Sequence, residues 1–462
     1  MRPTLCVAGA FGLLASGVNA LQVDFSNDDS IKQAASTIAF GLLKYYTGNN
    51  TGDTPGNLPD PYFWWEAGAM FGTMVDYWFY TGDESYVPVT TQALLHQVGD
   101  DKDFMPWNQT STLGNDDQGF WAMAAMSAAE NNFPNPPADQ PQWLALVQAV
   151  FNEYVDRWDT AKCNGGLRWQ IFTFNAGFNY KNSISNGCFF NIASRLARYT
   201  GNQTYADWAE KVWDWMYDEV KFIDADYNVY DGAGVETACT QISDAKWTYN
   251  AGIFLHGAAV MYNFTGGNST WRDRTQGLAQ RAAGFFDDGV AVERQCEPAG
   301  QCDTDQLSFK AYLMRWMAGA SQMAPFTFDI LMPLVRSSAA AAALQCSGSP
   351  AVNLYRGDPG TACGTRWTRK GAYDGTAGVG QQMSALSAVQ YTLVKKESTA
   401  NQAPVTASTG GTSQGNVNAG AATDTKIPAP RPITTAERVA AGFATTAVLF
   451  GVLAGGIFVV KD

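Results

Sequence analysis

The stretch Tyr199-Thr200-Gly201-Asn202-Gln203-Thr204-Tyr205 sets the pattern from which the fold can be predicted. An apolar segment ends at Gly201, and glycine suits the left-handed position that follows the last turn of a helix. The polar residues from Asn202 to Thr204 are typical helix N-caps. Behind them, apolar residues recur at the spacing of one helix face: Tyr205, Trp208, Val212, Trp215 and Met216. The stretch therefore predicts a helix, a tight turn and a second helix.

The same turn recurs along the chain. Three other aromatic-Thr-Gly sequences close apolar segments: Tyr46-Thr47-Gly48, Tyr80-Thr81-Gly82 and Phe264-Thr265-Gly266. The first of these segments carries Ile31, Ala35, Ile38 and Leu42 on one helical face, and sustained period-two alternation, which marks strands, is missing. Repeated over residues 21–396, such hairpins predict an all-α domain of about twelve helices, an (α/α)6 toroid. An open helical solenoid is the alternative, and the lack of a strict period disfavours it.

The two ends of the chain differ from this domain. Arg2, an apolar run and the small-residue ending Val18-Asn19-Ala20 predict a secretory signal peptide over residues 1–20. Residues 397–438 are rich in Ser, Thr, Gly and Pro and contain no aromatic residue, so we expect a disordered linker. Residues 439–462 form an apolar tail. With the small-residue cluster at 418–422 upstream, this tail matches a signal for GPI attachment, after which lipid would hold the protein outside the cell. A retained transmembrane helix is the alternative.

Charge and glycosylation signals fit an exported protein. The net charge of −13 provides no basic surface for phosphates, which argues against a nucleic-acid partner. Five Asn-x-Ser/Thr sequons are predicted surface positions for N-glycans: Asn49, Asn108, Asn202, Asn263 and Asn268. We therefore expect a secreted protein at the outer face of the plasma membrane or in the cell wall.

Cysteine usage points to disulfides rather than to metal. Removal of Cys6 with the signal peptide leaves seven of the eight cysteines in an oxidising compartment. Short loops favour the pairs Cys296–Cys302 and Cys346–Cys363. Two of the other three, Cys163, Cys188 and Cys239, are expected to join and leave one free, and the sequence leaves open which two. No metal-ligand spacing is present.

Histidine chemistry is poorly supported. The chain has only His96 and His256, and neither lies near a partner motif for a Ser-His-Asp or Cys-His mechanism. Both are interpreted as structural.

The pair Asp116-Asp117 is the strongest chemical signal. It lies in Gly114-Asn115-Asp116-Asp117-Gln118-Gly119, directly before an apolar helical run. Neighbouring Cα atoms lie about 3.8 Å apart, so the two carboxyl groups can reach the separation of roughly 5 Å that a retaining glycosidase uses. A helix N-terminus favours one ionised carboxylate, whose charge raises the pKa of its neighbour and leaves it a proton donor. The alternative is a solvated helix cap, as expected for the other Asp-Asp pairs at 28–29, 100–101 and 287–288.

Several aromatic and amide clusters are typical of sugar subsites. Aromatic faces stack on sugar C–H surfaces, and amides both donate to and accept from hydroxyls. Core packing or helix capping is the alternative for each residue taken singly. The predicted substrate contacts are Trp64, Trp65, Glu66, Asn115, Trp169, Gln170, Lys181, Asn182, Tyr249, Asn250 and Gln381. Glu66 stands out because a charge in so apolar a segment is costly unless it is paired or faces a cleft.

Together these motifs resemble glycoside hydrolase family 76, the α-1,6-mannanase family, and within it the GPI-anchored cell-wall members of fungi. The resemblance rests on segments that span nearly the whole domain: Trp64-Trp65-Glu66-Ala67-Gly68, Gly114-Asn115-Asp116-Asp117-Gln118, Gly165-Gly166-Leu167-Arg168-Trp169-Gln170, Lys181-Asn182 with Ser185-Asn186-Gly187, Trp247-Thr248-Tyr249-Asn250 and Gly380-Gln381-Gln382-Met383.

The resemblance implies an (α/α)6 fold and a retaining mechanism with Asp116 as nucleophile and Asp117 as acid/base, without a metal or cofactor. It also implies a mannose-containing glycan as donor, either the core of a GPI anchor or α-1,6-mannan. Fungal members are thought to move GPI-anchored proteins onto wall β-glucan. The alternatives are a hydrolytic mannan endo-1,6-α-mannosidase and a non-catalytic scaffold that binds wall glycans.

Overall fold

The computed structural model describes residues 20–371, 373–396, 404–420 and 435–460 of the 462-residue chain. Apart from Ala20, the predicted signal peptide lies outside the described residues. The chain divides into two compact units, residues 1–422 and residues 423–462. Each unit is described by itself.

Six helices form an inner ring in the first unit: α2 (Trp64–Thr81), α4 (Asn115–Glu130), α6 (Ser183–Thr200), α8 (Thr248–Phe264), α10 (Phe309–Met323) and α12 (Val379–Gln390). Each packs against the next, and α12 packs against α2, so the ring is closed. Because each inner helix is reached through an outer one, the six run in the same direction and their N-terminal ends meet at one end of the ring. This arrangement confirms the predicted all-α toroid.

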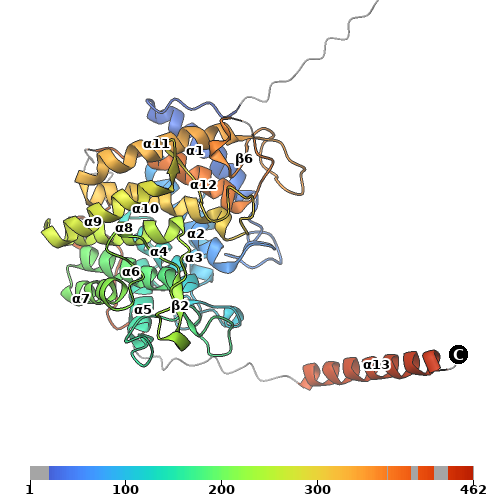
Figure 1. The fold of residues 1–462 in the computed structure, drawn as a ribbon. Helices are drawn as coiled ribbons and strands as arrows, with labels where there is room; N and C mark the ends of the chain where they lie inside the picture. The colour runs from blue at the N-terminus through green and yellow to red at the C-terminus, as the bar shows by residue number, and fades with distance from the viewer. Residues whose placement is uncertain (1–19, 372, 397–403, 421–434, 461–462) are drawn as a thin grey trace, which may run out of the picture. The chain divides into compact units, whose positions relative to one another are not determined.

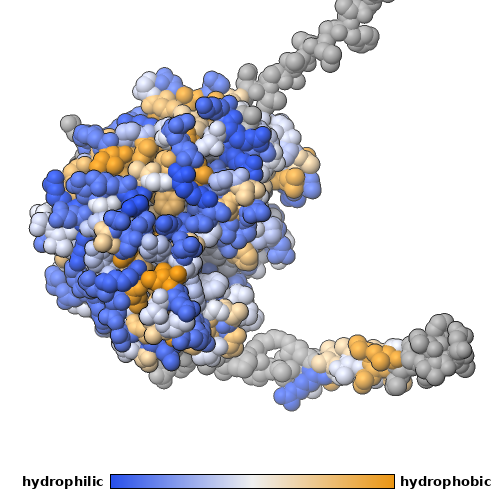
Figure 2. All heavy atoms as spheres, in the orientation of Figure 1, coloured by the Kyte–Doolittle hydropathy of each residue, from blue (hydrophilic) through white to orange (hydrophobic). Residues whose placement is uncertain are grey.

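Six further helices surround the ring: α1 (Asp28–Leu43), α3 (Val87–His96), α5 (Trp143–Asp156), α7 (Gln203–Asp214), α9 (Ser269–Ala282) and α11 (Phe328–Gln345). α7 continues as one π-helical turn, Trp215–Glu219. Helix α1 packs against α12, so the first and last helices of the domain lie side by side (Figure 1). That contact closes the domain. Hydrophilic side chains cover most of the face seen in Figure 2, and apolar side chains form only small patches on it.

Close approach of the inner helices depends on small residues. A Cβ on Gly68 of α2 would lie 2.8 Å from the ring of Trp121 on α4. On α4, every residue except Asp116 and Asp117 is buried. The inner helices therefore form the core, and the Asp pair is where α4 opens to solvent.

The aromatic-Thr-Gly turns end inner helices, as predicted, in three of the four places. Gly82 and Gly201 follow α2 and α6 with left-handed φ values of 76° and 73°, and Gly266 follows α8 with φ 64°. In each, the threonine hydroxyl donates to the carbonyl four residues earlier. The turn at residues 46–48 differs, because α1 ends at Leu43, before the turn begins.

Strands are few and short. β1 (Tyr180–Asn182) pairs antiparallel with β2 (Gly232–Gly234), β3 (Phe286–Asp287) with β4 (Val290–Ala291), and β5 (Cys346–Gly348) with β6 (Ala362–Cys363). They stiffen loops between helices. The β1–β2 pair fixes the loop at the start of α6, at the end of the ring where the inner helices begin.

Residues 404–420 lie against the domain, so the predicted disordered linker is wrong for this part of 397–438. The Val405 amide donates to the carbonyl of Glu130 at the end of α4, and Arg198 donates to the carbonyl of Pro404. Asn152 of α5 donates to the carbonyls of Val417 and Ala419. Side chains of the domain donate hydrogen bonds to the backbone of residues 404–420. We call residues 404–420 the strap. Composition gave no sign of such partners, because the strap contains no aromatic anchor.

The second unit contains helix α13 (Thr435–Val460), whose side chains from 438 to 452 are exposed and largely apolar. Within the described residues, one helix, Pro325–Gln345, is long and apolar enough to be a candidate membrane span. This helix comprises residues 325–327 and the outer helix α11, and half of its apolar window is buried inside the first unit, so we interpret it as an outer helix packed on the ring.

Candidate active site

A cavity of about 670 Å³ opens where the inner helices begin. Residues at or directly before the first turns of five inner helices line its wall: Trp64 and Trp65 (α2), Asp116 and Asp117 (α4), Asn182 (α6), Tyr249 (α8) and Phe309 (α10). The remaining wall comes from the loops that precede these helices. The partial positive charge of helix N-termini favours carboxylates here.

Asp116 and Asp117 are held in place by backbone groups. Asp116 Oδ1 accepts from the Asp117 amide (3.1 Å), and its Oδ2 accepts from the side-chain amide of Asn182 (3.4 Å). Asp117 Oδ2 accepts from the backbone amide of Gly114, the N-cap residue of α4, at 2.5 Å. The two carboxyl groups therefore have different partners although they are adjacent in sequence.

Burial raises the pKa of both carboxyl groups. For Asp116 the charge of Asp117 adds to the effect of burial and holds the pKa well above its usual range. For Asp117 burial raises the pKa to about 7, and the charge of Asp305 contributes, while the bond from Gly114 opposes the rise. Since two such close carboxylates repel each other, the pair retains one proton near neutral pH. One carboxylate and one carboxylic acid are the two groups that glycosyl transfer requires.

Two more carboxyl groups in the cavity wall were missed by sequence reasoning. Asp231, next to β2, accepts a hydrogen bond from the Tyr180 hydroxyl at 2.8 Å. Asp305 accepts from the indole N–H of Trp65 at 3.0 Å, and burial raises its pKa to about 6. Neither stands in a recognisable motif, because both come from loops that only the fold brings to the cavity.

Aromatic rings form much of the rest of the wall. Tyr249 and Phe309 stack at 3.8 Å with an interplanar angle of 7°. Trp169 backs onto Gly177, where a Cβ would lie 2.3 Å from the Trp169 ring. Phe309, Tyr62 and Phe63 were not predicted as site residues. Of the predicted sugar contacts, the structure brings six to the wall: Trp64, Trp65, Trp169, Gln170, Asn182 and Tyr249.

Five predicted contacts lie behind the wall rather than on it: Glu66, Asn115, Lys181, Asn250 and Gln381. Lys181 is fully buried and donates to the carbonyls of Asp159, Lys162 and Gly165, so it fixes a loop. Asn115 is buried too, and its side-chain amide donates to the carbonyl of Arg168.

The other three buried residues also support the wall from behind. Asn250 and Gln381 lie in the first turns of α8 and α12. Burial, with a contribution from the charge of Asp305, raises the pKa of Glu66 well above its usual range, which favours the neutral form of this buried side chain. Sequence position alone could not separate the helix starts that face the cavity from those that face the core.

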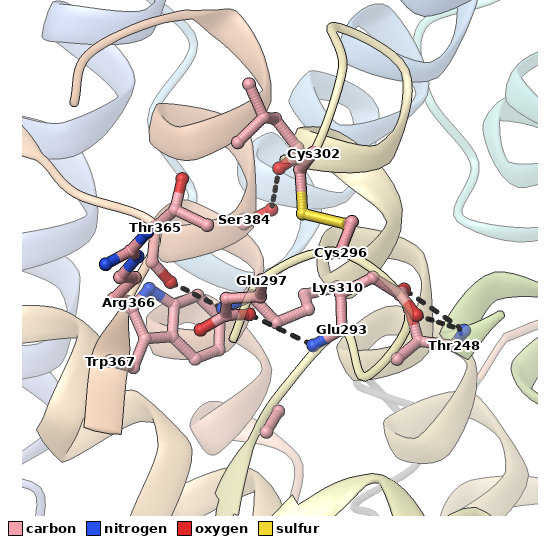
Figure 3. A network of polar contacts seen from close by, with 12 residues as sticks. Thr248, Glu293, Cys296, Glu297, Cys302, Lys310, Thr365, Arg366, Trp367 and Ser384 are labelled. Carbon is pink, nitrogen blue, oxygen red and sulfur yellow. Dashed lines mark hydrogen bonds and ion pairs between the residues drawn. A yellow bond between two sulfur atoms is a disulfide. The ribbon is translucent and has the colours of Figure 1, made fainter. Parts of the chain in front are cut away.

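A buried polar network joins Thr248 and Lys310, the sequence neighbours of the stacked pair Tyr249 and Phe309 (Figure 3). Thr248, directly before Tyr249, donates to the carboxylate of Glu293 through its amide and its hydroxyl. Lys310, directly after Phe309, forms a 2.9 Å ion pair with Glu297. The Glu293 amide donates to Glu297, which joins the two halves of the network.

The disulfide Cys296–Cys302 closes the loop that carries Glu297 and leads to Asp305. Cys346–Cys363 is also formed, as predicted. Cys163 pairs with Cys239, and Cys188 is the free, buried thiol, which resolves the question that sequence left open.

No histidine lines the cavity among the residues that the structure describes. His256 is buried, and its ring Nδ1 lies 3.1 Å from the Asn191 amide, whereas His96 is exposed at the end of α3. Among the residues that the structure describes, no group of three His, Cys, Asp or Glu side chains is placed to hold a metal ion. All five sequon asparagines are exposed, and their glycosylation remains a prediction.

Comparison with known proteins places this geometry in a family. Residues 30–408 match the model of glycosyl hydrolase family 76. The mannan endo-1,6-alpha-mannosidase DCW1 of Saccharomyces cerevisiae is 45% identical over 457 residues, which cover 98% of this chain and 99% of the relative. The mannan endo-1,6-alpha-mannosidase DFG5 of the same yeast is 42% identical over 455 residues, or 98% and 96% of the two chains.

Solved structures agree. The crystal structure of Dfg5 from Chaetomium thermophilum, in complex with glucosamine, has a TM-score of 0.80 and 48% identity, covering 86% of this chain and 97% of that one. An inactive variant of the alpha-1,6-mannanase GH76A of Salegentibacter sp. HEL1_6, in complex with alpha-1,6-mannotetrose, shares the fold at a TM-score of 0.62 and 17% identity, covering 79% and 98%. The family match covers most of the chain and includes every residue of the cavity wall. The chain therefore belongs to glycosyl hydrolase family 76 and is a glycoside hydrolase.

Proposed function

We propose that this protein is a retaining α-mannosidase that transfers the glycan it cleaves, acting on the mannose core of GPI anchors and using wall β-glucan as acceptor. The observation that carries the proposal is the Asp116–Asp117 pair, which lines the cavity at the start of α4. An α-mannoside donor is supported by fungal relatives that are named mannan endo-1,6-alpha-mannosidase and that match this chain over nearly their full length.

The chemistry needs only the two carboxyl groups. Asp116 attacks the anomeric carbon while Asp117 gives its proton to the departing glycosidic oxygen, and a mannosyl ester forms on Asp116. Asp117, now a base, takes a proton from an incoming hydroxyl, whose oxygen bonds to the anomeric carbon and frees Asp116. Water as the incoming group gives hydrolysis, and a glucan hydroxyl gives transfer.

The charge of the cavity supports a GPI-type donor. Four of its lining residues are Asp (116, 117, 231 and 305), and among the described residues no Lys, Arg or His lines it. Such a wall disfavours anionic sugars and favours a glycan with an ammonium group, since opposite charges attract in a partly buried site. The Chaetomium relative was crystallised with glucosamine, an amino sugar.

Hydrolysis of α-1,6-mannan is the second candidate. The names of the yeast relatives favour it, and bacterial members of the same fold were solved with mannotriose and mannotetrose. A scaffold that binds wall glycans without turning them over is the third. Its aromatic wall would be the same, but it would have no use for a proton shared between two buried carboxyl groups.

Product analysis separates these candidates. The domain over residues 21–420 is incubated with a GPI-core mannoside or an α-1,6-mannotetraoside, with and without a β-glucan oligomer. Transfer predicts a mannosyl-glucan product that appears only with acceptor, whereas hydrolysis gives free mannosides in both cases. Asp116→Asn is the inactive reference, and Asn replacement of the exposed pair Asp100 and Asp101 is the matched control. Binding without any product from the unmodified domain would support the scaffold and contradict the proposal.

We also propose export and GPI anchoring at the outer face of the plasma membrane or in the wall. Three disulfides and five exposed sequons support passage through the secretory pathway. Treatment of cells with a phosphatidylinositol-specific phospholipase C tests the anchor: release of the protein supports it, and retention with the membrane contradicts it in favour of a transmembrane helix.

A further inference from the structure

The most exposed Phe and Trp rings of residues 20–420 gather at the cavity. They are Phe63 (52% exposed), Trp107 (64%), Trp169 (39%) and Phe174 (63%). Phe63 and Trp169 line the cavity, whereas Trp107 and Phe174 lie on loops beside it and have no part in the chemistry proposed above. Single exposed apolar residues are normal, but rings collected at one place mark a contact surface.

The two loops that carry Trp107 and Phe174 are bonded to each other and to the site. The side-chain amide of Asn175 donates to the carbonyl of Thr110 at 3.3 Å, and the backbone amide of Ile171 donates to the carbonyl of Leu113. The backbone amide of Asn115, at the start of α4, donates to the carbonyl of Trp169 at 2.8 Å. The rings therefore belong to one connected unit that ends at the catalytic pair.

Two of these rings, Phe174 and Trp169, are backed on one face and exposed on the other. Phe174 lies parallel to Phe172, with ring centroids 5.4 Å apart and an interplanar angle of 6°, and Phe172 is only 4% exposed. Trp169 is backed by the glycine at 177, which leaves no room for a Cβ. A fixed ring with one open face is suited to stacking on a flat partner and loses little entropy when it does so.

The two loops that carry the rings contain no charged residue of their own. Residues 104–115 and 169–180 contain no Asp, Glu, Lys or Arg, in a chain of net charge −13. A neutral partner is therefore favoured over a charged polymer. In a β-linked glucose residue all ring substituents are equatorial, so both faces present C–H groups, whereas the axial O2 of mannose interrupts one face.

We propose that Trp107 and Phe174, continued by Trp169 at the cavity mouth, form a stacking platform that binds a β-glucan chain and directs its end into the cavity. This inference rests on the proposed transfer function, because it identifies where the acceptor lies. The bound hydroxyl approaches from the side of the cavity where Asp117 acts as base. A chain held on the platform also displaces water from the mouth, which favours transfer over hydrolysis.

The test uses Trp107→Ala and Phe174→Ala in the domain over residues 21–420, after enzymatic removal of N-linked glycans so that a glycan on Asn108 cannot cover Trp107. Calorimetry measures binding of β-glucan oligomers of increasing length, and product analysis measures the ratio of transfer to hydrolysis. Each substitution is expected to weaken glucan binding about 2- to 10-fold, the range for one aromatic stacking contact. The double variant is expected to lose more than either single variant.

Matched variants control for folding and for general apolarity. Trp107→Phe and Phe174→Tyr keep a flat ring and are expected to bind nearly as the unmodified domain does. Leu354→Ala removes an exposed apolar side chain (54% exposed) that does not line the cavity, and it is expected to change nothing. Turnover of a small activated α-mannoside, which does not reach the platform, is expected to be unchanged in every variant.

Three results would overturn the platform. They are unchanged glucan binding in the double variant, equal loss of α-1,6-mannan binding and glucan binding, and no glucan binding by an unmodified domain that turns over the small mannoside. The last result would leave the glycosidase function intact and remove only the acceptor site. Failure to turn over any mannoside, with glucan binding that depends on both rings, would instead contradict the proposed enzyme while keeping the platform.

Discussion

At the scale of single residues, the proposed catalytic pair Asp116–Asp117 depends on a charge from elsewhere in the cavity, that of Asp305. Asp117 has a pKa of about 7, to which burial contributes most and the charge of Asp305 contributes further. An acid that must be protonated for the first step is active below its pKa and loses its proton as the pH rises through it. The pKa of Asp116 is raised as well, so the proton belongs to the pair. We therefore expect the rate of glycosidic cleavage to fall as the pH rises past the point at which the pair loses this proton.

Asp305→Asn tests this dependence. The substitution removes a negative charge near Asp117, while the amide oxygen can still accept the hydrogen bond from Trp65. The pKa of Asp117 falls, so the alkaline limb of the pH–rate profile moves to lower pH with little change in the thermal unfolding midpoint. An unmoved alkaline limb would show that Asp305 does not act on the acid. Asp139→Asn, which changes an exposed carboxyl that does not line the cavity, is the control.

At the scale of elements, α2 and α4 position the site through a contact that only glycine permits. Trp121 of α4 packs on Gly68, stacks on Trp64 with ring centroids 5.2 Å apart, and donates to the carbonyl of Trp64. The ring cannot retreat from a larger residue at position 68 without moving Trp64, which lines the cavity.

Gly68→Ala is therefore expected to lower the free energy of unfolding by about 1–3 kcal/mol, the range for overpacking a core. It should also reduce turnover, because Trp64 shifts. Gly284→Ala is the matched control, since its Cβ would meet no atom within 4 Å. Chemical denaturation measures the difference, and equal stability of the two variants would contradict this role for Gly68.

The strap is the second element, and we expect its hydrogen bonds to stabilise the domain. The amides and carbonyls of residues 404–420 bond to α5, α6 and the end of α4, and none of these residues lines the cavity. Each bond contributes a net of about 0.5–1.5 kcal/mol, which the cost of ordering the backbone offsets in part.

We expect a domain that ends at Lys396 to unfold at lower temperature than one that ends at Gly420, with the same turnover of a small mannoside. Ser413→Ala, which removes the hydroxyl that accepts from the amide of Leu144, should give a smaller decrease in the same direction. Equal thermal unfolding midpoints for the two domain lengths would show that the strap does not stabilise the domain.

How much of the site could be predicted from sequence depends on how local each signal is. The turn at Tyr199-Thr200-Gly201 and the pair Asp116-Asp117 are complete within a few residues, so helix ends and the candidate acids could be read directly. Asp305 could not, because a disulfide-closed loop far along the chain brings it to the cavity. The burial of Lys181 could not be predicted either. Its partners are the carbonyls of a loop, which no sequence pattern marks.

At the scale of the whole molecule, the ring gathers the N-termini of its inner helices at one end. Residues far apart in sequence, from Trp64 to Phe309, therefore line a single cavity. The toroid could be predicted because its hairpins repeat. The strap could not, because composition reports apolar content and not the side-chain partners of a polar backbone. The fold thus provides a buried acidic site with an aromatic rim, and the proposed function depends on covalent chemistry at Asp116.

The most direct measurement is peptide mass spectrometry of the domain over residues 21–420 after reaction with a 2-deoxy-2-fluoro mannosyl donor that carries a good leaving group. A retaining mechanism predicts a fluoromannosyl adduct on the peptide that contains Asp116, absent from Asp116→Asn and discharged faster when a β-glucan oligomer is added. Turnover of an ordinary α-mannoside without any trapped adduct, or an adduct on another carboxyl such as Asp305, would contradict it.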